Sequence, residues 1–572
     1  MDIVHPEGVA NIPDSRGLNL FLQDPTFAPL LKAHMGEVDG AAMIPRLTDL
    51  GARAAQLDDW AFVADHNPPV LRPRTRRGEP LQSLQKHPDY VALEKVAFEE
   101  LGLAALSHRK PSSRPLVKYA LTFLFVQSEF GLCCPVSMTD SLTRTLRRYG
   151  DPVLVARFLP NLIAQDLDTL YQGAMFMTEQ AAGSDVARTA TQARLVDGTW
   201  RLYGDKWFCS NPDAGLAMVL ARPEGAKAGI DGLALFLLPR TLPDGSRNHY
   251  QIMRLKDKLG TRSMASGEIV LDGAVAYLVG ELGRGFHQMA DMINMSRLSN
   301  GVRAAGLMRR ATTEALYVAR NRHAFGRALI DMPLMQRQLL KIMLPGEQAR
   351  SMFMHTATCL ERADAGDAQA AKLVRILTPL IKFRACRDAR RVTGDAMEVR
   401  GGVGYIEEWV EPRLVRDSHL GSIWEGTSNI VALDVLRAVK REGVLVPYQQ
   451  HLHDLLLENS MPTICRAQLG AVLDRTCDLV NKVAMAGPTE LTRRAASALY
   501  HISSAIIMAW EAARMQPDYR RLALAQLVLR YRLLPSDPLA GPECDSGAPV
   551  LRAILDECPI SLDDALSLAQ AQ

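Results

Sequence analysis

Four segments of the chain concentrate side chains that could do chemistry. The last of them places a glutamate, Glu425, between Trp424 and Gly426, so that a carboxylate would stand beside an aromatic wall. A carboxylate held in an apolar pocket is suited to take a proton from a weakly acidic carbon. The same residues also fit a plain capping loop, because a polar loop ahead of a helical stretch is a common way to start a helix. The role of Glu425 therefore depends on its context.

The other three segments are equally modest when each is taken alone. Met175–Asp185 has the pattern apolar-T-E-x-x-x-G-S-D, which a helix cap and turn would also satisfy. Gly204–Ser210 has the sequence GDKWFCS, and Arg322–Gly326 has the sequence RHAFG. The glycines within Gly401–Gly404 precede no clear helix and lack the G-x-G-x-x-G spacing, so a Rossmann dinucleotide domain is not expected.

These segments are spread over a helical chain with a strand-rich insert. Apolar residues recur at helical spacing from about residue 90 to 170, and again from about 285 to 440. Between these stretches, runs 191–196 and 199–203 flank Asp197-Gly198, which predicts a β-hairpin with a type I′ turn. Further candidate strands lie at 217–220, 233–238, 252–255, 269–271 and 275–278. Since no helical pattern separates them, a small antiparallel barrel or sandwich is expected.

The periodicity predicts four domains in a fold that is mostly α with a central antiparallel β domain. They are an N-terminal helical domain (1–170), a β-barrel domain (171–284), a helical bundle with the candidate base (285–440) and an extra C-terminal helical domain (441–572). The proline- and arginine-rich stretch 67–78 is predicted to be a loop, whose four arginines (72, 74, 76 and 77) could touch a polyanion but in most such runs are simply solvated.

In this order, the four segments resemble signatures of the acyl-CoA dehydrogenase superfamily, over roughly residues 90–440. The fourth signature continues from Gly401–Tyr405 through Arg416-Asp417 to Ile423–Asn429. The resemblance implies FAD-dependent α,β-dehydrogenation of an acyl-CoA thioester, with the Cα proton going to Glu425 and the Cβ hydride to flavin N5. The family's other base position corresponds to Ser296, just before Arg297, and a serine cannot serve as the base.

The resemblance also implies which residues contact the cofactor and the substrate. It places Met177, Thr178, Trp207 and Ser210 against the flavin and Ser184 near the pyrophosphate, with Thr427 and Asn429 closing over the cofactor. Against the adenosine half of a neighbouring subunit's FAD it places Arg322, Phe325, Gly401 and Gly402. The substrate-binding residues are expected to be Ser184, Arg297 and Glu425. Because the FAD contacts are divided between two chains, the resemblance implies a homo-oligomer, a tetramer or a dimer. For Trp207 and Phe325 the alternative to a cofactor contact is a place in the hydrophobic core.

Several features are similar to the AidB-like branch of that superfamily. They are Asn67-Pro68-Pro69 in a long N-terminal lead, the CPVSMT segment Cys134–Thr139, the LLPRTLPDG segment Leu237–Gly245, a tryptophan at 424, and the C-terminal helical domain. That branch is associated with DNA binding through its C-terminal domain and with the response to alkylation damage. A DNA-associated flavoprotein with weak or no dehydrogenase activity is therefore the alternative function. A flavin monooxygenase or nitroalkane-oxidising relative is a third, which the retained Glu425 disfavours.

The charge of the C-terminal domain argues against DNA as a partner. From Arg441 onward the chain has twelve Lys and Arg against fifteen Asp and Glu, which gives a net charge of −3. Phosphate binding needs the opposite sign. The arginines at 493, 494, 514, 520, 521, 530 and 532 could still form a basic stripe. An electron-transfer flavoprotein is a candidate electron acceptor.

The whole composition indicates a cytoplasmic globular protein. The formal net charge is +3, and no apolar run approaches the roughly 20 residues that a membrane span needs. The nine cysteines are scattered, form no C-x-x-C pair and have no zinc-finger spacing, so reduced thiols and no metal are expected.

Overall fold

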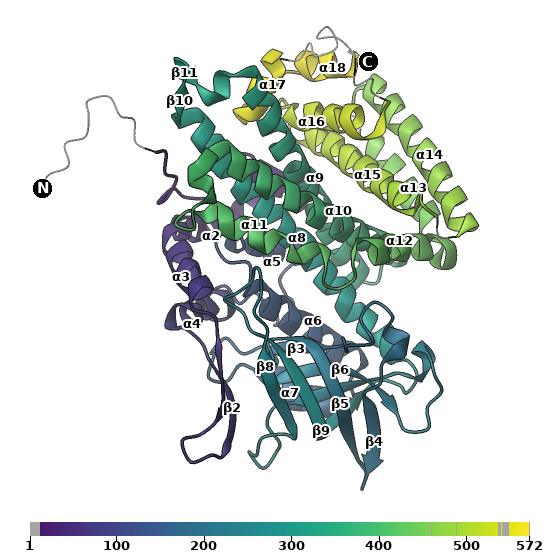
Figure 1. Cartoon of the computed structure of the whole chain (residues 1–572). Helices are drawn as coiled ribbons and strands as arrows, with labels where there is room; N and C mark the ends of the chain where they lie inside the picture. The colour runs from purple at the N-terminus through teal and green to yellow at the C-terminus, as the bar shows by residue number, and fades with distance from the viewer. Residues whose placement is uncertain (1–11, 459, 488, 536–538, 540–547, 571–572) are drawn as a thin grey trace, which may run out of the picture. The chain divides into compact units, whose positions relative to one another are not determined.

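The computed structural model describes residues 12–458, 460–487, 489–535, 539 and 548–570 of the chain. These residues form two compact units, whose elements are labelled in Figure 1. The barrel unit comprises Gln56–Arg303 and Ile423–Val431. The helical unit comprises the described residues up to Ala55, Ala304–Ser422 and the described residues from Ala432 onward. The division into four domains stays a prediction.

The barrel unit contains a closed, mostly antiparallel sheet, drawn in blue to teal in Figure 1. Its strands follow the order β3-β6-β4-β5-β9-β7, β7 pairs back with β6, and β8 pairs with β9. The parallel pairs are β3–β6 and β4–β6. The strands are β3 (Gly173–Phe176), β4 (Gln192–Val196), β5 (Thr199–Ser210), β6 (Leu216–Pro223), β7 (Ala234–Pro239), β8 (Tyr250–Leu255) and β9 (Ser266–Val279).

Two turns show how the residues set this sheet. Asp197 and Gly198 have φ of +48° and +73°, as the predicted type I′ turn between β4 and β5 requires. Asp272-Gly273, which separated two candidate strands in the sequence, lies instead inside the single strand β9. The partners of Leu202 and Tyr203 on β5 are Ala274 and Asp272, so Gly273, at φ +76°, is the extra residue of a bulge. The two predicted strands are therefore one.

The helices of the barrel unit precede and follow this sheet. They are α3 (Ala54–His66), α4 (Pro88–Glu94), α5 (Pro115–Phe125), α6 (Cys133–Tyr149), α7 (Pro152–Leu162) and the first half of α8 (Gly285–Asn321). The predicted loop 67–78 is wrong for Val70–Arg74, which form strand β1 of a hairpin with β2 (Pro80–Gln85), whereas 67–69 and 75–78 are irregular and most of the stretch is exposed as predicted. Pro73 falls where the register shifts between Arg72 and Arg74, a position at which a missing N–H is tolerated.

The helical unit is a bundle around α9, α10 and α15, which pack against one another in the teal to yellow part of Figure 1. Its elements are α1 (Phe27–Met35), α2 (Glu37–Ala52), the second half of α8, β10 (His323–Ala324), β11 (Arg327–Ala328), α9 (Pro333–Asp364), α10 (Ala368–Arg400), α11 (Val410–Ser418), α12 (Ser428–Glu442) from Ala432 onward, α13 (Leu445–Leu456), α14 (Thr463–Ala486), α15 (Thr492–Arg514), α16 (Arg520–Val528), α17 (Ala548–Leu555) and α18 (Leu562–Gln570). The structure confirms a mostly α fold with a central β domain and additional C-terminal helices.

Two of the arginines considered for a basic stripe or a solvated face are buried inside this bundle. The side chains of Arg520 and Arg521 are each only 1% exposed. Arg521 forms ion pairs with Glu511 and Glu347, and Arg520 lies 3.5 Å from Glu347. Both guanidinium groups are thus used inside the protein, so they cannot contact phosphates at its surface. Any basic surface of the C-terminal helices therefore comes from the other arginines.

None of the eight cysteines within the described ranges forms a disulfide, and Cys544 lies outside those ranges. Within the part of the chain that the structure describes, no helix combines the length and apolarity that crossing a membrane requires.

Candidate active site

Two side chains of α8 hold the Glu425 carboxylate from both sides. Ser296 donates its hydroxyl to Oε1 of Glu425, and Asn300 donates its amide to Oε2. Nε of Arg297 donates to the backbone carbonyl of Glu425 at 3.1 Å. Glu425 has a φ of +54° and is followed by Gly426 at +99°. A left-handed non-glycine residue costs about 1–2 kcal/mol, and such residues persist where the surrounding structure fixes them. The structure thus brings the predicted base together with Arg297.

The predicted aromatic wall is present, and Asn300 connects it to the carboxylate. Oδ1 of Asn300 accepts a hydrogen bond from the indole Nε1 of Trp424 at 2.7 Å. The Trp424 ring stacks near Phe130, with ring centroids 6.5 Å apart and an interplanar angle of 20°. The guanidinium of Arg303 lies 4.9 Å from the Trp424 ring centroid. The aromatic rings beside Glu425 are therefore apolar, but the guanidinium cation of Arg303 lies against the ring of Trp424.

Sequence reasoning missed Asn300 and Arg303. Both are buried, and Nη1 and Nη2 of Arg303 have no hydrogen-bond partner among the described residues. One signal could have found them, because Ser296, Asn300 and Arg303 follow the i, i+4, i+7 spacing of a single helix face. Polar residues at those positions of a long apolar helix indicate a site within it.

A buried ion pair joins the first two sequence motifs. Nζ of Lys206 lies 2.8 Å from Oε1 of Glu179, and the Lys206 side chain is fully buried. The hydroxyl of Thr191 donates to the same Glu179 oxygen at 2.6 Å. The backbone N–H of Trp207 donates to the carbonyl of Thr178 at 2.8 Å. These bonds fix Met177 and Thr178, which follow β3, beside Trp207.

Trp207 is aimed away from the barrel core by an irregularity in β5. The register between β5 and β9 shifts between Lys206 and Cys209, so Trp207 and Phe208 lie in a bulge. A bulge re-aims side chains in this way. The Trp207 side chain is half-buried, and Nζ of Lys256 lies 3.5 Å from its ring centroid. Trp207 is not among the residues of the barrel core, which weighs against the core interpretation.

The remaining predicted cofactor contacts of the barrel unit are accessible. Ser210 ends β5 and is half-buried, with its hydroxyl 3.4 Å from that of Ser266. Ser184, Thr427 and Asn429 have exposed side chains. Ser184 lies in the loop that Glu179 anchors, and Thr427 precedes α12. Exposure leaves these side chains available to a ligand.

The four residues predicted for the adenosine half gather at the surface of the helical unit. Nη1 of Arg322 donates to the carbonyl of Arg400 at 2.9 Å, directly before Gly401 at the end of α10. Phe325 forms the loop between β10 and β11, with a φ of +53° and 96% of its side chain exposed. A phenyl ring this exposed belongs to no core, which overturns the core interpretation for Phe325. A strained, exposed aromatic residue indicates a binding surface.

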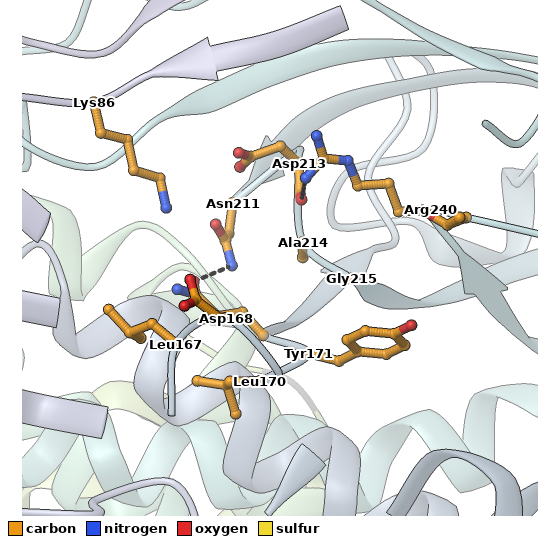
Figure 2. A pocket seen from close by; sticks show the side chains of 12 residues that line it. Lys86, Leu167, Asp168, Leu170, Tyr171, Asn211, Asp213, Ala214, Gly215 and Arg240 are labelled. Carbon is orange, nitrogen blue, oxygen red and sulfur yellow. Dashed lines mark hydrogen bonds between the residues drawn. The ribbon is translucent and has the colours of Figure 1, made fainter. Parts of the chain in front are cut away.

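The barrel unit also has a polar cavity of about 290 Å³, shown in Figure 2. Lys86, Asp168, Asp213 and Arg240 point toward it, and the dashed line marks the 3.1 Å hydrogen bond from Asn211 to Gln172. None of the predicted cofactor or substrate residues lines this cavity, although Asn211 directly follows Ser210. It is therefore distinct from the Glu425 site.

Comparison with known proteins agrees with this geometry along most of the chain. Residues 283–440 match the C-terminal domain of acyl-CoA dehydrogenases, and residues 174–274 match their middle domain. Residues 11–169 match the N-terminal domain of the adaptive response protein AidB. A similar protein, the putative acyl-CoA dehydrogenase AidB of Escherichia coli, is 36% identical over 69% of this chain and 72% of its own length.

The chain belongs to the acyl-CoA dehydrogenase family, and its N-terminal domain is that of the AidB-like branch. Acyl-CoA dehydrogenase family member 11 of Caenorhabditis elegans is 31% identical over 77% of this chain and 73% of its own length. The crystal structure of C. elegans ACDH-11 with C11-CoA superimposes with a TM-score of 0.86 at 28% identity, covering 93% of this chain and 95% of the other. The resemblance stated from four short motifs is confirmed.

Proposed function

We propose that this protein is an FAD-dependent acyl-CoA dehydrogenase in which Glu425 takes the Cα proton of an acyl-CoA thioester. The observation that carries the proposal is the Glu425 carboxylate, held in one orientation by Ser296 and Asn300 on a strained backbone. A base must lie within hydrogen-bond reach of the proton in a fixed geometry, and this arrangement supplies the geometry. The complex of C. elegans ACDH-11 with C11-CoA supports acyl-CoA as the substrate class.

The residues of the barrel unit fit a flavin. Met177, Thr178, Trp207 and Ser210 are half-buried around the end of β3 and the bulge of β5. They offer a planar aromatic group, a hydroxyl and backbone polar groups on one surface, which suits a planar ring with hydrogen-bonding edges. FAD, when bound, supplies the acceptor for the Cβ hydride, which no side chain can accept.

The chain's own residues then bind, orient and exclude water. Glu425 receives the proton on a carboxylate oxygen, while Ser296 and Asn300 keep the carboxylate from rotating. The backbone N–H of Glu425 would donate to the thioester oxygen as negative charge develops there. Trp424 and Phe130 supply apolar walls that keep water from the acyl chain.

We further propose a homo-oligomer in which Arg322, Phe325, Gly401 and Gly402 contact the adenosine half of a neighbouring subunit's FAD. The support is the exposure of Phe325, since an aromatic side chain left 96% exposed at a strained φ has no role inside its own chain.

An anaerobic titration of the purified yellow protein with a panel of acyl-CoAs tests the proposal. Bleaching of the flavin absorbance by one chain type is expected, and Glu425→Gln should slow that bleaching by about 10²–10⁴-fold because an amide cannot take the proton. Glu408→Gln, an exposed glutamate of the helical unit, is the control and should bleach as the unmodified protein does. A flavin that stays oxidised with every thioester would contradict the proposal and favour the DNA-associated alternative.

A further inference from the structure

Three metal-binding side chains meet inside the helical unit. His355 and Cys359 lie one turn apart on α9, and His451 comes from α13. The ligand atoms of the three residues all lie within 4.8 Å of one another. His355 and Cys359 are buried, with 4% and 1% of their surfaces exposed, and His451 is half-buried. Nothing in the dehydrogenase chemistry uses these residues.

We propose that His355, Cys359 and His451 bind one transition-metal ion, with zinc as the best match. One thiolate and two imidazoles are a ligand set that zinc prefers, and the hard cations magnesium and calcium would require oxygen ligands instead. The i, i+4 spacing on α9 presents His355 and Cys359 on one helix face, which is how helices supply two ligands to one ion. Water can fill the fourth position, because His451 lies at the accessible side of the cluster.

The spacing of the two imidazoles fits an ion after a small adjustment. Nε2 of His355 and Nε2 of His451 are 2.8 Å apart. Two nitrogens at about 2.0–2.1 Å from a tetrahedral zinc ion are about 3.3 Å apart, so the rings need to separate by about half an ångström. A turn of one imidazole achieves this without moving a helix. The three side chains therefore need only a small movement to bind an ion.

A hydrogen-bonded histidine pair is the alternative, and it leaves the cluster incompletely satisfied. Nδ1 of His355 is buried and has no hydrogen-bond partner among the described residues. The rings of His34 and Trp510 approach His355 with centroids 6.2 and 5.9 Å away. An ion bound at Nε2 of both histidines would leave this Nδ1 unsatisfied, so the three converging ligand atoms, and not this nitrogen, indicate the metal.

The electrostatics permit a cation at this place. His355 is buried and His451 is half-buried, and the neutral imidazole is the form that binds a metal. Arg362 also faces the cluster, but it is exposed and paired with Asp367 at 2.6 Å. Binding of the ion would displace the thiol proton of Cys359 to solvent as the sulfur–zinc bond forms.

Such an ion would connect two parts of the chain. His355 and Cys359 belong to the predicted bundle domain, and His451 belongs to the first helix after residue 441, where the predicted C-terminal domain begins. Zinc would cross-link α9 to α13 and thereby stabilise the docking of the C-terminal helices. This role is independent of the proposed dehydrogenase activity.

Metal analysis of the untagged full-length protein tests the site. After gel filtration in metal-free buffer, about one zinc per chain is expected for the unmodified protein. The variants Cys359→Ala and His451→Ala should each retain less than about a tenth of that amount, because a site with two protein ligands binds zinc far more weakly. The matched controls are Cys558→Ala, an exposed thiol, and His453→Ala, two residues beyond His451 and paired with Asp474 at 2.8 Å. Both controls should bind zinc as the unmodified protein does.

A spectroscopic titration guards against variants that fail to fold. Cobalt added to the chelator-treated, unmodified protein should give the absorption bands of a tetrahedral site and a sulfur-to-cobalt charge-transfer band, and zinc should abolish both. Melting temperature should rise by several degrees when zinc is restored to the unmodified protein. An unmodified protein that carries no zinc and shows no thiolate–cobalt band would overturn the proposal, as would full zinc occupancy in Cys359→Ala.

Discussion

Ser296 donates its hydroxyl to the carboxylate of Glu425. Ser296 lies at the position that the resemblance matches to the family's other base, so in this chain it would orient the proposed base, Glu425, instead of acting as a base itself. Asn300, one turn further along α8, holds the second carboxylate oxygen. Glu425 thus has one preferred orientation, set by a rigid helix rather than by its own loop.

Replacing Ser296 by alanine should slow flavin reduction without unfolding the protein. Losing one hydrogen bond to a carboxylate costs about 1.5–3 kcal/mol, which corresponds to a rate lower by about tenfold or more. Stopped-flow measurement of flavin reduction across a range of pH would check this, because a positioning role predicts an altered pH profile. Ser299→Ala on the same helix is the control. An unchanged rate and pH profile in Ser296→Ala would show that Ser296 does not position the base.

Lys206→Met should destabilise the barrel unit and release the cofactor. The substitution leaves the carboxylate of Glu179 buried without its ion-pair partner, which costs about 3–5 kcal/mol. Thermal melting and the flavin absorbance per chain measure the two effects. The double variant Glu179→Gln/Lys206→Met should recover part of the stability, because no uncompensated charge remains. Equal stability of the single and double variants would refute this account of the motif.

Phe325→Ser should weaken cofactor binding while leaving the fold intact. Because the ring is exposed, the change should alter the stability of the cofactor-free protein by less than about 0.5 kcal/mol. If Phe325 contacts a neighbouring subunit's FAD, the affinity for FAD should fall by about tenfold or more. Fluorescence titration with FAD measures this. Val446→Ser, at another strongly exposed apolar residue of the helical unit, should bind FAD normally. Normal FAD affinity in Phe325→Ser would exclude the contact.

The charge of Asp140 should stabilise the folded protein by an amount that depends on pH. Burial by itself would raise the pKa of the Asp140 carboxyl. Lys118 at 2.8 Å and His108 at 3.0 Å lower that pKa by more than burial raises it, so it lies well below its usual range. A carboxyl with a depressed folded-state pKa stabilises the protein above the unfolded pKa of about 3.9 and loses that effect as the pH falls toward the folded value. The melting temperature of Asp140→Asn should therefore lie below that of the unmodified protein at pH 7.

The difference in melting temperature should shrink as the pH falls below about 4. Asp168→Asn, at an exposed carboxyl, is the control and should melt as the unmodified protein at each pH. A gap between Asp140→Asn and the unmodified protein that stays constant from pH 7 to pH 3.5 would contradict the assigned role of the Asp140 charge.

The sequence by itself determined the family, the class of fold and the candidate base. Periodicity separates helices from strands because burial on one face repeats every 3.6 or 2 residues, and Asp197-Gly198 specifies its turn through local backbone preference. Four ordered motifs identified the family although each was weak. Local rules failed at Asp272-Gly273 and at Val70–Arg74, because cross-strand pairing turned an apparent turn into a bulge and part of an apparent loop into a strand.

Tertiary structure alone decided what the side chains do to one another. Ser296 and Glu425 lie 129 positions apart, and His355 and His451 lie 96 apart, so no local pattern joins them. Arg520 and Arg521 looked like surface charge until packing placed them against Glu347. Residue type sets the chemistry that a side chain can do, but which partner it meets follows from the packing of helices distant in the sequence.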